Sequence, residues 1–233
     1  MSTPPVPVVL VPGLGLDGRS WSAVRRQLPG PHDVALLPSQ GLPAPWGTDL
    51  SVPAQAERVR AAVARRWPQD VPLVLVGHSA GCPVAVEVAA HWPRVTGLVL
   101  VGPITEPTSR SWPRTAVRWL RTARHEQAWE VPQLVPQYAR TGLGSLLRGM
   151  DAMRWYRTGQ VLEQVTARVT VVRGEHDHIA PADWVARLTT RPGARMVTVP
   201  GAGHMVPLTD PAAVADAVSA VRQVPADAAD SGS

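Results

Sequence analysis

The 233-residue sequence contains no phenylalanine and no lysine, and its single cysteine is Cys82. One cysteine can form neither an intrachain disulfide nor a cysteine-based metal cluster, so the sequence excludes both. All 23 basic residues are arginine, which raises the pI to about 10.8 although the net charge is only +5. No basic run or nucleic-acid-binding motif accompanies these arginines, and only two tyrosines are present. We therefore expect no nucleic-acid partner.

Long apolar segments are also missing. The N-terminal stretch MSTPPVPVVLVPG carries no positive charge ahead of its apolar run, and that run is too short for a signal sequence or a membrane span. We therefore expect a cytoplasmic protein without a membrane span. With 45% hydrophobic and 18% charged residues, the composition is that of a globular protein, and the length suits one domain with a large core.

Short β-branched runs alternate with longer helical patterns along most of the chain. This alternation is typical of the α/β class, in which a mostly parallel sheet is covered by helices on both faces. It predicts about six strands, at residues 6–11, 33–37, 72–76, 96–101, 168–173 and 195–199. It predicts helices near residues 19–28, 53–67, 80–91, 182–190 and 211–222.

One interval breaks this alternation. It contains no strand-like run, only segments rich in tryptophan and arginine that are interrupted by Pro113, Pro132, Pro136 and Gly142. We interpret it as a helical insertion after the fourth strand, placed over the carboxyl ends of the strands, where open α/β sheets bind their ligands. The expected organisation is a core of residues 1–101 and 168–223, an insertion of residues 102–167 and a flexible tail of residues 224–233.

The most informative motif is Gly77-His78-Ser79-Ala80-Gly81, which directly follows a predicted strand and directly precedes a predicted helix. In a nucleophile elbow, a serine adopts a strained backbone conformation so that its hydroxyl projects from the turn. Small residues on either side let the strand and the helix pass close together. The motif predicts that Ser79 is a nucleophile. The alternative is a tight turn whose serine only caps the helix.

A serine hydroxyl becomes a good nucleophile only when a base removes its proton. The best candidate base is His204, in the loop GAGHMVP after the last predicted strand. The best-placed acid to orient it is Asp177, in the loop GEHDHIAP after the fifth strand. The three groups lie at three strand ends and follow the order serine, acid, histidine, which favours a catalytic triad. Glu106, just past the fourth strand, is an alternative acid.

These three motifs resemble those of the α/β-hydrolase fold family, and the resemblance extends from Val6 to Val221. It implies that the insertion is a cap and that the chain begins at the family's third strand. It also implies a reaction that needs no cofactor and no metal.

The resemblance further implies an oxyanion hole built from two backbone N–H groups. One belongs to Ala80, directly after the nucleophile, and the other to Leu14, in the loop after the first strand. The family commonly has His-Gly in that loop, whereas this chain has Pro12 and Gly13. A glycine-rich turn without a catalytic task is the alternative.

Other residues near these motifs have simpler interpretations. His176 and His178 flank Asp177, but three adjacent residues rarely converge on one ion, so we predict no metal site. We expect His78 to pack beneath the elbow, and Cys82 to pack as a small apolar group.

The insertion carries two further patterns. Its tryptophans are candidate substrate-binding residues for an apolar acyl or alcohol group, or simply the apolar faces that attach the insertion to the sheet: Trp112, Trp119, Trp129 and Trp155. Its arginines recur at helical spacing: Arg110, Arg114, Arg118 and Arg121. They predict a cationic stripe, which is either a solvated face or a docking site for an anionic partner, such as an acyl carrier protein or a phosphate-bearing thioester.

The sequence thus predicts a serine hydrolase that cleaves an ester, lactone or thioester through an acyl-enzyme. Two alternatives stay open. The same triad could cleave a carbon–carbon bond or a hydroxynitrile, or the fold could serve as a binding protein that uses the tryptophan-rich cleft.

Overall fold

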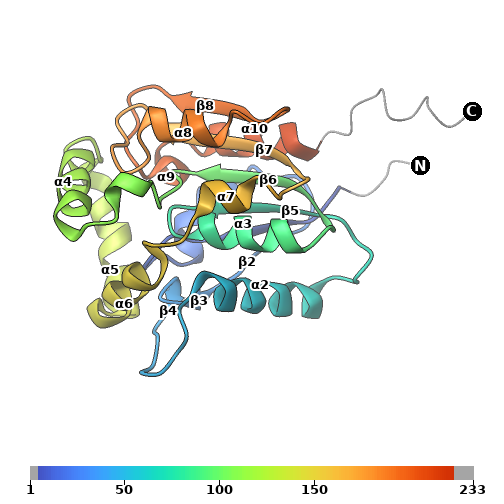
Figure 1. Ribbon diagram of the computed structural model, residues 1–233, viewed down its shortest axis with the longest axis horizontal. Coiled ribbons are helices and arrows are strands. Elements are labelled where there is room, and N and C mark those ends of the chain that lie inside the picture. The colour runs from blue at the N-terminus through green and yellow to red at the C-terminus, as the bar shows by residue number, and fades with distance from the viewer. Residues whose placement is uncertain (1–4, 223–233) are drawn as a thin grey trace, which may run out of the picture.

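The computed structural model describes residues 5–222 and is built around one six-stranded sheet (Figure 1). Its strands lie in the order β2-β1-β5-β6-β7-β8, and every pair of neighbours is parallel. The strands are β1 (Val8–Val11), β2 (His32–Val34), β5 (Leu73–His78), β6 (Val95–Val101), β7 (Arg168–Gly174) and β8 (Arg195–Val199). The parallel sheet predicted from the sequence is therefore confirmed. The tail expected at 224–233 lies outside the described residues.

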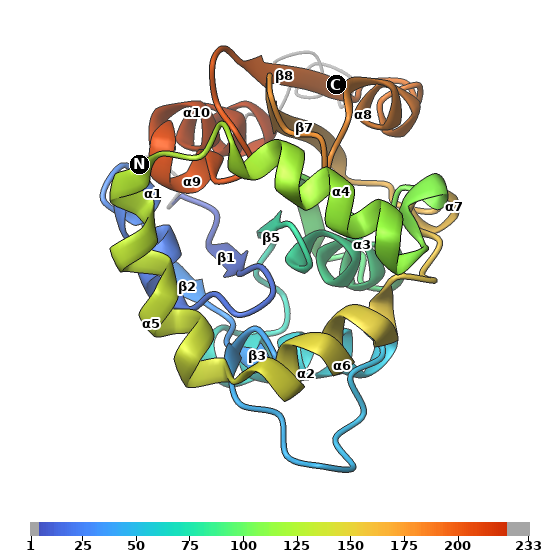
Figure 2. The same ribbon diagram turned by 90° about the vertical axis from the view of Figure 1, so that its left-hand side faces the viewer.

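Helices cover both faces of the sheet, as the two views show (Figures 1 and 2). One layer consists of α1 (Ser22–Arg25), α9 (Val206–Thr209) and α10 (Pro211–Arg222). The other consists of α2 (Val52–Arg66), α3 (Gly81–His91), α7 (Thr158–Leu162) and α8 (Ala182–Leu188). A parallel sheet needs this double cover because its strands are apolar on both faces.

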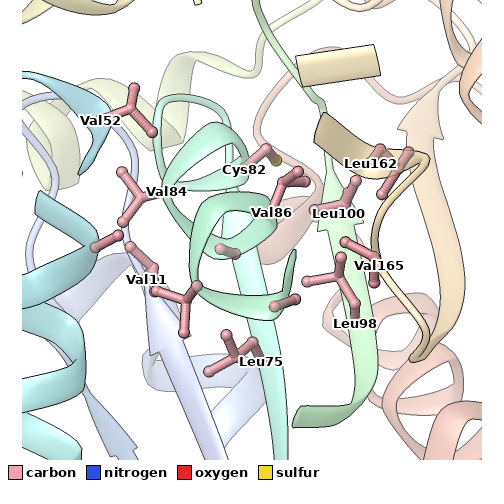
Figure 3. Packing of buried hydrophobic residues seen from close by; sticks show 14 of the residues in the cluster. Val11, Val52, Leu75, Cys82, Val84, Val86, Leu98, Leu100, Leu162 and Val165 are labelled. Carbon is pink, nitrogen blue, oxygen red and sulfur yellow. The ribbon is translucent and has the colours of Figure 1, made fainter. Parts of the chain in front are cut away.

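The core shows the two-residue period of the strands directly. Val11 of β1 and Leu75 of β5 face the layer that contains α3 (Figure 3). Val9 of β1 belongs to the same cluster. Their neighbours Val8 and Leu10 face the layer that contains α10. Each fully buried valine or leucine contributes about 1.5–3 kcal/mol to folding. The two clusters together hold the ends of the strands in place.

Several boundaries differ from those predicted. The strand expected to reach Leu37 ends at Val34, and a separate small sheet follows, made of β3 (Leu37–Pro38) and β4 (Gly41–Leu42). Ser39, with a φ of 65° outside the range of a strand, lies in the turn between β3 and β4. The helix expected at 19–28 begins instead as a 3-10 turn, η1 (Gly18–Trp21), and continues as α1. Helix α9 has no counterpart in the prediction.

The interval between β6 and β7 is helical. It contains η2 (Pro107–Ser109), α4 (Trp112–Ala123), η3 (Ala128–Glu130), α5 (Val131–Thr141), α6 (Leu143–Met153) and α7. Helices α4, α5 and α6 lie beyond the carboxyl ends of the strands and surround the ends of β1 and β5 in Figure 2.

The prolines of this interval do not interrupt helices as expected. Pro113 and Pro132 lie in the first turns of α4 and α5, where a missing N–H costs nothing. Pro136 lies inside α5, which continues past it. Gly142, with a φ of 81°, does separate α5 from α6.

None of the helices within residues 5–222 combines the length and the hydropathy that a bilayer-spanning segment requires.

Candidate active site

Ser79 occupies the sharp bend between β5 and α3. Its φ is 52°, in the left-handed region that costs a non-glycine residue on the order of 1–3 kcal/mol. The bend is held by the N–H of Ser79, which donates to the carbonyl oxygen of Val101 over 2.8 Å. The side chain is only 6% exposed. The structure therefore gives Ser79 the backbone conformation that the elbow motif predicts.

The glycines around Ser79 permit a close approach of strand and helix. A Cβ on Gly77 would lie 2.5 Å from the carbonyl oxygen of Gly81, and a Cβ on Gly81 would collide with the carbonyl oxygen of Val11. Any larger residue at either position would push α3 away from the sheet. The expected need for small residues on both sides of the serine is confirmed.

Asp177 and His204 form a buried pair at the ends of β7 and β8. Oδ2 of Asp177 lies 2.8 Å from Nδ1 of His204, and the two side chains are 0% and 3% exposed. The other carboxylate oxygen accepts hydrogen bonds from the N–H groups of Ile179 and Ala180. With Nδ1 donating to Asp177, the lone pair of a neutral His204 lies on Nε2.

The two partners shift each other's pKa in opposite directions. Burial alone would lower the pKa of His204, but the charge and hydrogen bond of Asp177, with the charge of Glu126, raise it above its ordinary value. Burial alone would raise the pKa of Asp177, but the charge and hydrogen bond of His204 and two backbone N–H groups lower it. Asp177 thus stabilises the positive form of His204.

Ser79 and His204 both lie beside the end of β6. The backbone N–H of Ser79 donates to the carbonyl oxygen of Val101. A Cβ on the next residue, Gly102, would lie 2.9 Å from Nδ1 and Cε1 of His204. Nε2 of His204 is buried and has no hydrogen-bond partner within residues 5–222, so it is not bonded to the Ser79 hydroxyl in this structure. Hydrogen bonds of this kind are often loose in unliganded sites and tighten with substrate.

His78 lies under the elbow, and Cys82 packs in the buried apolar cluster, both as predicted. His78 is 1% exposed and its Nε2 donates to the carbonyl oxygen of His204 over 3.2 Å. Burial lowers the pKa of His78 to about 3, so this ring stays neutral. The thiol of Cys82 donates to the carbonyl oxygens of Gly77 and Val101, and burial raises its pKa well above the usual value.

The loop after β1 lies against the elbow. A Cβ on Gly13 would be 3.1 Å from the Cβ of Ser79. The N–H groups of Leu14 and Ala80 donate no hydrogen bond within residues 5–222, and Ala80 precedes the first turn of α3. The positive end of a helix favours a negative charge. Both N–H groups thus lack an acceptor within the described residues.

Glu106 is not the partner of His204. It is 2% exposed and forms ion pairs with Arg118 at 3.1 Å and with Arg187 at 3.2 Å. Arg118, only 24% exposed, therefore does not belong to a solvated stripe as expected, and Arg110 lies ahead of α4. Arg114 and Arg121 remain exposed.

A small cleft lies between the helices α4 and α6 of the cap and the loops that follow β6 and β7. It is lined by Ile104, Thr105, Glu106, Thr115, Arg118, Trp119, Met150, Arg154 and Ile179. Trp119 connects it to the histidine, since the ring centroids of Trp119 and His204 are 6.0 Å apart.

The other three tryptophans of the insertion do not line this cleft. Trp112 and Trp155 lie against the guanidinium of Arg154. Trp129 lines a separate depression beside Gly201.

The histidines around Asp177 pack against the cap. The ring of His176 stacks on His125 with a centroid separation of 4.2 Å, and His178 lies 6.1 Å from His125. Within residues 5–222, no group of three or more histidine, cysteine, aspartate or glutamate side chains is arranged to hold a metal ion.

Two residues near the site escaped the sequence analysis. Gln40, fully buried, donates from Nε2 to the carbonyl oxygen of Ala80 over 3.0 Å. Glu126 accepts a 2.6 Å hydrogen bond from the backbone N–H of His204. Neither residue belongs to a recognisable motif, because each reaches the site through the packing of distant segments.

Comparisons with known proteins agree with this architecture. A search among curated protein sequences finds no significant match. The structure is similar to MGS-M2, an alpha/beta hydrolase enzyme from a Medee basin deep-sea metagenome library, with a TM-score of 0.75 and 17% identity over 95% of this chain and 90% of that one. It is also similar to a thermophilic esterase from Thermogutta terrifontis, with a TM-score of 0.68 and 22% identity over 95% and 92% of the two chains.

A third similar structure is the N-formylmaleamic acid deformylase Nfo from Pseudomonas putida S16, with a TM-score of 0.67 and 20% identity over 93% of this chain and 92% of that one. At these identities the likeness shows the fold alone. The family model described as alpha/beta hydrolase family matches residues 8–217, which is most of the sequence. The chain therefore belongs to the alpha/beta hydrolase family.

Proposed function

We propose that this hydrolase cleaves ester-type bonds of carboxylic acids through an acyl-enzyme, with Ser79 as nucleophile, His204 as base and Asp177 as orienting acid. One observation carries the proposal. A buried Asp177–His204 pair leaves Nε2 of the imidazole without a partner, and the serine of a strained bend lies beside the same strand end.

The proposed reaction has two halves. The Ser79 oxygen attacks the carbonyl carbon while Nε2 of His204 takes the hydroxyl proton, and the N–H groups of Leu14 and Ala80 bind the oxyanion. The bond to the leaving group then breaks, and Nε2 returns the proton to that group. In the second half, Nε2 takes a proton from water while the water oxygen attacks the acyl carbonyl carbon. The bond to the Ser79 oxygen then breaks, Nε2 returns the proton to that oxygen, and the carboxylic acid leaves. Asp177 stays ionised throughout.

The lining of the cleft favours a substrate with a neutral, apolar acyl or alcohol group. Ile104, Trp119 and Met150 supply apolar walls. The charged side chains are already occupied, because Arg118 binds Glu106 and Thr108, and Arg154 binds Asp151 and a backbone carbonyl. A substrate carboxylate would have to displace these bonds.

An anionic partner, such as an acyl carrier protein, would have to bind through Arg114 and Arg121, because the guanidinium of Arg118 is paired within the chain. This part of the proposal predicts a faster reaction with a carrier-bound thioester than with the same free thioester. The advantage should disappear when both exposed arginines are replaced by glutamine.

The test combines a screen of p-nitrophenyl esters, acyl thioesters and lactones with labelling by a fluorophosphonate probe. We expect Ser79→Ala to lose the label and to lower kcat by a factor on the order of 10⁶. Ser219→Ala, at a partly exposed position of α10 far along the chain from the elbow, is the matched control and should keep both. Unchanged ester hydrolysis by Ser79→Ala would contradict the proposal. Cyanide release or diketone cleavage without ester turnover would point to the lyase or carbon–carbon alternative, and an unlabelled wild type to a binding protein.

A further inference from the structure

The end of α4 and the turn after it contact both loops that carry the proposed acid and base. Oγ1 of Thr122, a residue only 1% exposed, accepts a hydrogen bond from the N–H of His178 over 3.0 Å. His125 stacks on His176. The cap is thus attached to the residues on both sides of Asp177.

Glu126 extends this attachment to the histidine loop. Its Oε1 accepts the N–H of His204 over 2.6 Å, and a Cβ on Gly203 would lie 2.8 Å from the same oxygen. A side chain at position 203 would therefore displace the carboxylate. Glu126 approaches the histidine from the cap, whereas Asp177 approaches it from the sheet.

Glu130, one helical turn further along the chain, lies against Glu126. It is 0% exposed, and its Oε1 accepts the N–H of Gln127 over 2.9 Å. Oε2 of Glu126 and Oε2 of Glu130 are both buried without a hydrogen-bond partner within residues 5–222. Burial, followed by the proximity of the Glu126 carboxyl group, raises the pKa of Glu130 to about 8. The uncharged form of Glu130 is therefore favoured at ordinary pH.

We propose that Glu126 is a positioning residue that fixes the backbone of His204 from the cap and places a second negative charge beside its imidazole. This inference rests on the proposed function, because it assigns Glu126 a task in the same reaction. The cap would then take part in catalysis by positioning His204 and stabilising its protonated form, in addition to enclosing the substrate.

Other titratable groups also lie around Glu126 and the imidazole of His204. They are His125 on the same turn, Glu130 on η3, Tyr138 on α5, His176, Asp177 and His178 on the acid loop, and His78 on the elbow. Among them, Asp177 acts on His204 in the same direction as Glu126. The effect of Glu126 must therefore be measured with Asp177 intact.

The experiment compares Glu126→Gln with Glu126→Ala. Glutamine keeps an oxygen that can accept the His204 N–H but removes the charge, whereas alanine removes both. We expect Glu126→Gln to move the acid limb of kcat/KM to lower pH by about 0.5–1 unit, with kcat at high pH within about threefold of wild type. Glu126→Ala should show the same displacement and lose about tenfold in kcat.

The control is Glu57→Gln, which removes the same charge from an exposed position on α2 and should leave the acid limb unchanged. A drop in Tm for both Glu126 variants with an unmoved acid limb would overturn the inference, because a purely structural contact would give that result.

A second readout separates this inference from the proposed function. The imidazole of His204 can be titrated by NMR, with its resonance assigned by loss in His204→Ala. A lower His204 pKa in Glu126→Gln supports the inference even if no ester is turned over, and an unchanged pKa overturns it even if Ser79 is labelled.

Discussion

The imidazole of His204 lies over the backbone of Gly102, where a Cβ would come within 2.9 Å of both Nδ1 and Cε1. Gly102 is held in this place by its own N–H, which donates to the carbonyl oxygen of Val172 over 2.8 Å, and its φ is 56°. The ring cannot move aside easily, because its Nδ1 is hydrogen-bonded to Oδ2 of Asp177, which would itself lie 3.1 Å from that Cβ. The end of β6 therefore determines where the proposed base lies.

Gly102→Ala should accordingly damage catalysis more than folding. The added methyl group would displace the imidazole, and a shift of about 1 Å at a catalytic group can cost on the order of 100-fold in rate. The matched control is Gly193→Ala, since Gly193 has a φ of 76° but no atom near the position of its Cβ. Both variants should lose about 1 kcal/mol of stability through backbone strain, and only Gly102→Ala should lose kcat. Equal kcat values would show that the His204 ring adapts freely.

The pH dependence of the wild type follows from the pair of shifted groups. Nε2 of His204 accepts a proton only when the ring is neutral, so kcat/KM should rise with pH as His204 loses its proton. Because Asp177 and Glu126 raise the pKa of His204, this limb should lie above the ordinary histidine value of 6.5. His78, with its pKa lowered to about 3, should add no limb near neutral pH. A pH–rate profile with its acid limb below 6.5 would contradict the assignment of His204.

The two candidate acids can be separated by isosteric replacement. Asp177→Asn should lower kcat by a factor on the order of 10⁴, because the amide no longer supports the required tautomer and charge of His204. Glu106→Gln should keep kcat within about tenfold of wild type and instead lower stability by about 1–3 kcal/mol, since two arginines lose a buried carboxylate. Steady-state kinetics and thermal unfolding on both variants decide the question. The opposite pattern would make Glu106 the acid.

The sequence was sufficient where function depends on short local patterns. Ser79, with its flanking glycines, can be recognised from the sequence because a tight strand-to-helix bend restricts the residues within a few positions. Asp177 and His204 could be placed because parallel strands bring their carboxyl ends to one edge of a sheet.

Contacts made by the packing of distant segments could not be predicted. Nothing near Arg118 in the sequence indicates that it binds the buried Glu106, and nothing near Glu126 indicates that it holds a loop 78 residues away. Pro136 illustrates the same limit, because packing overrides the local preference that predicts a break in α5.

The stability of the cap should depend on pH through Glu130. An unfolded glutamate titrates near 4.5, whereas burial raises the pKa of Glu130 in the folded chain to about 8. Between these values the folded state keeps a proton that the unfolded state has released, so the free energy of unfolding should fall as pH rises from about 4.5 to about 8.

Glu130→Gln removes this dependence, because its amide resembles the protonated carboxyl group and carries no charge at any pH. Relative to wild type, the variant should be nearly unchanged at pH 5 and more stable by about 1–2 kcal/mol at pH 8.5, which corresponds to a few degrees in Tm. Thermal unfolding at a series of pH values, with Glu57→Gln as the control, measures the difference. A gap between variant and wild type that stays constant with pH would mean that the folded chain ionises Glu130 without cost.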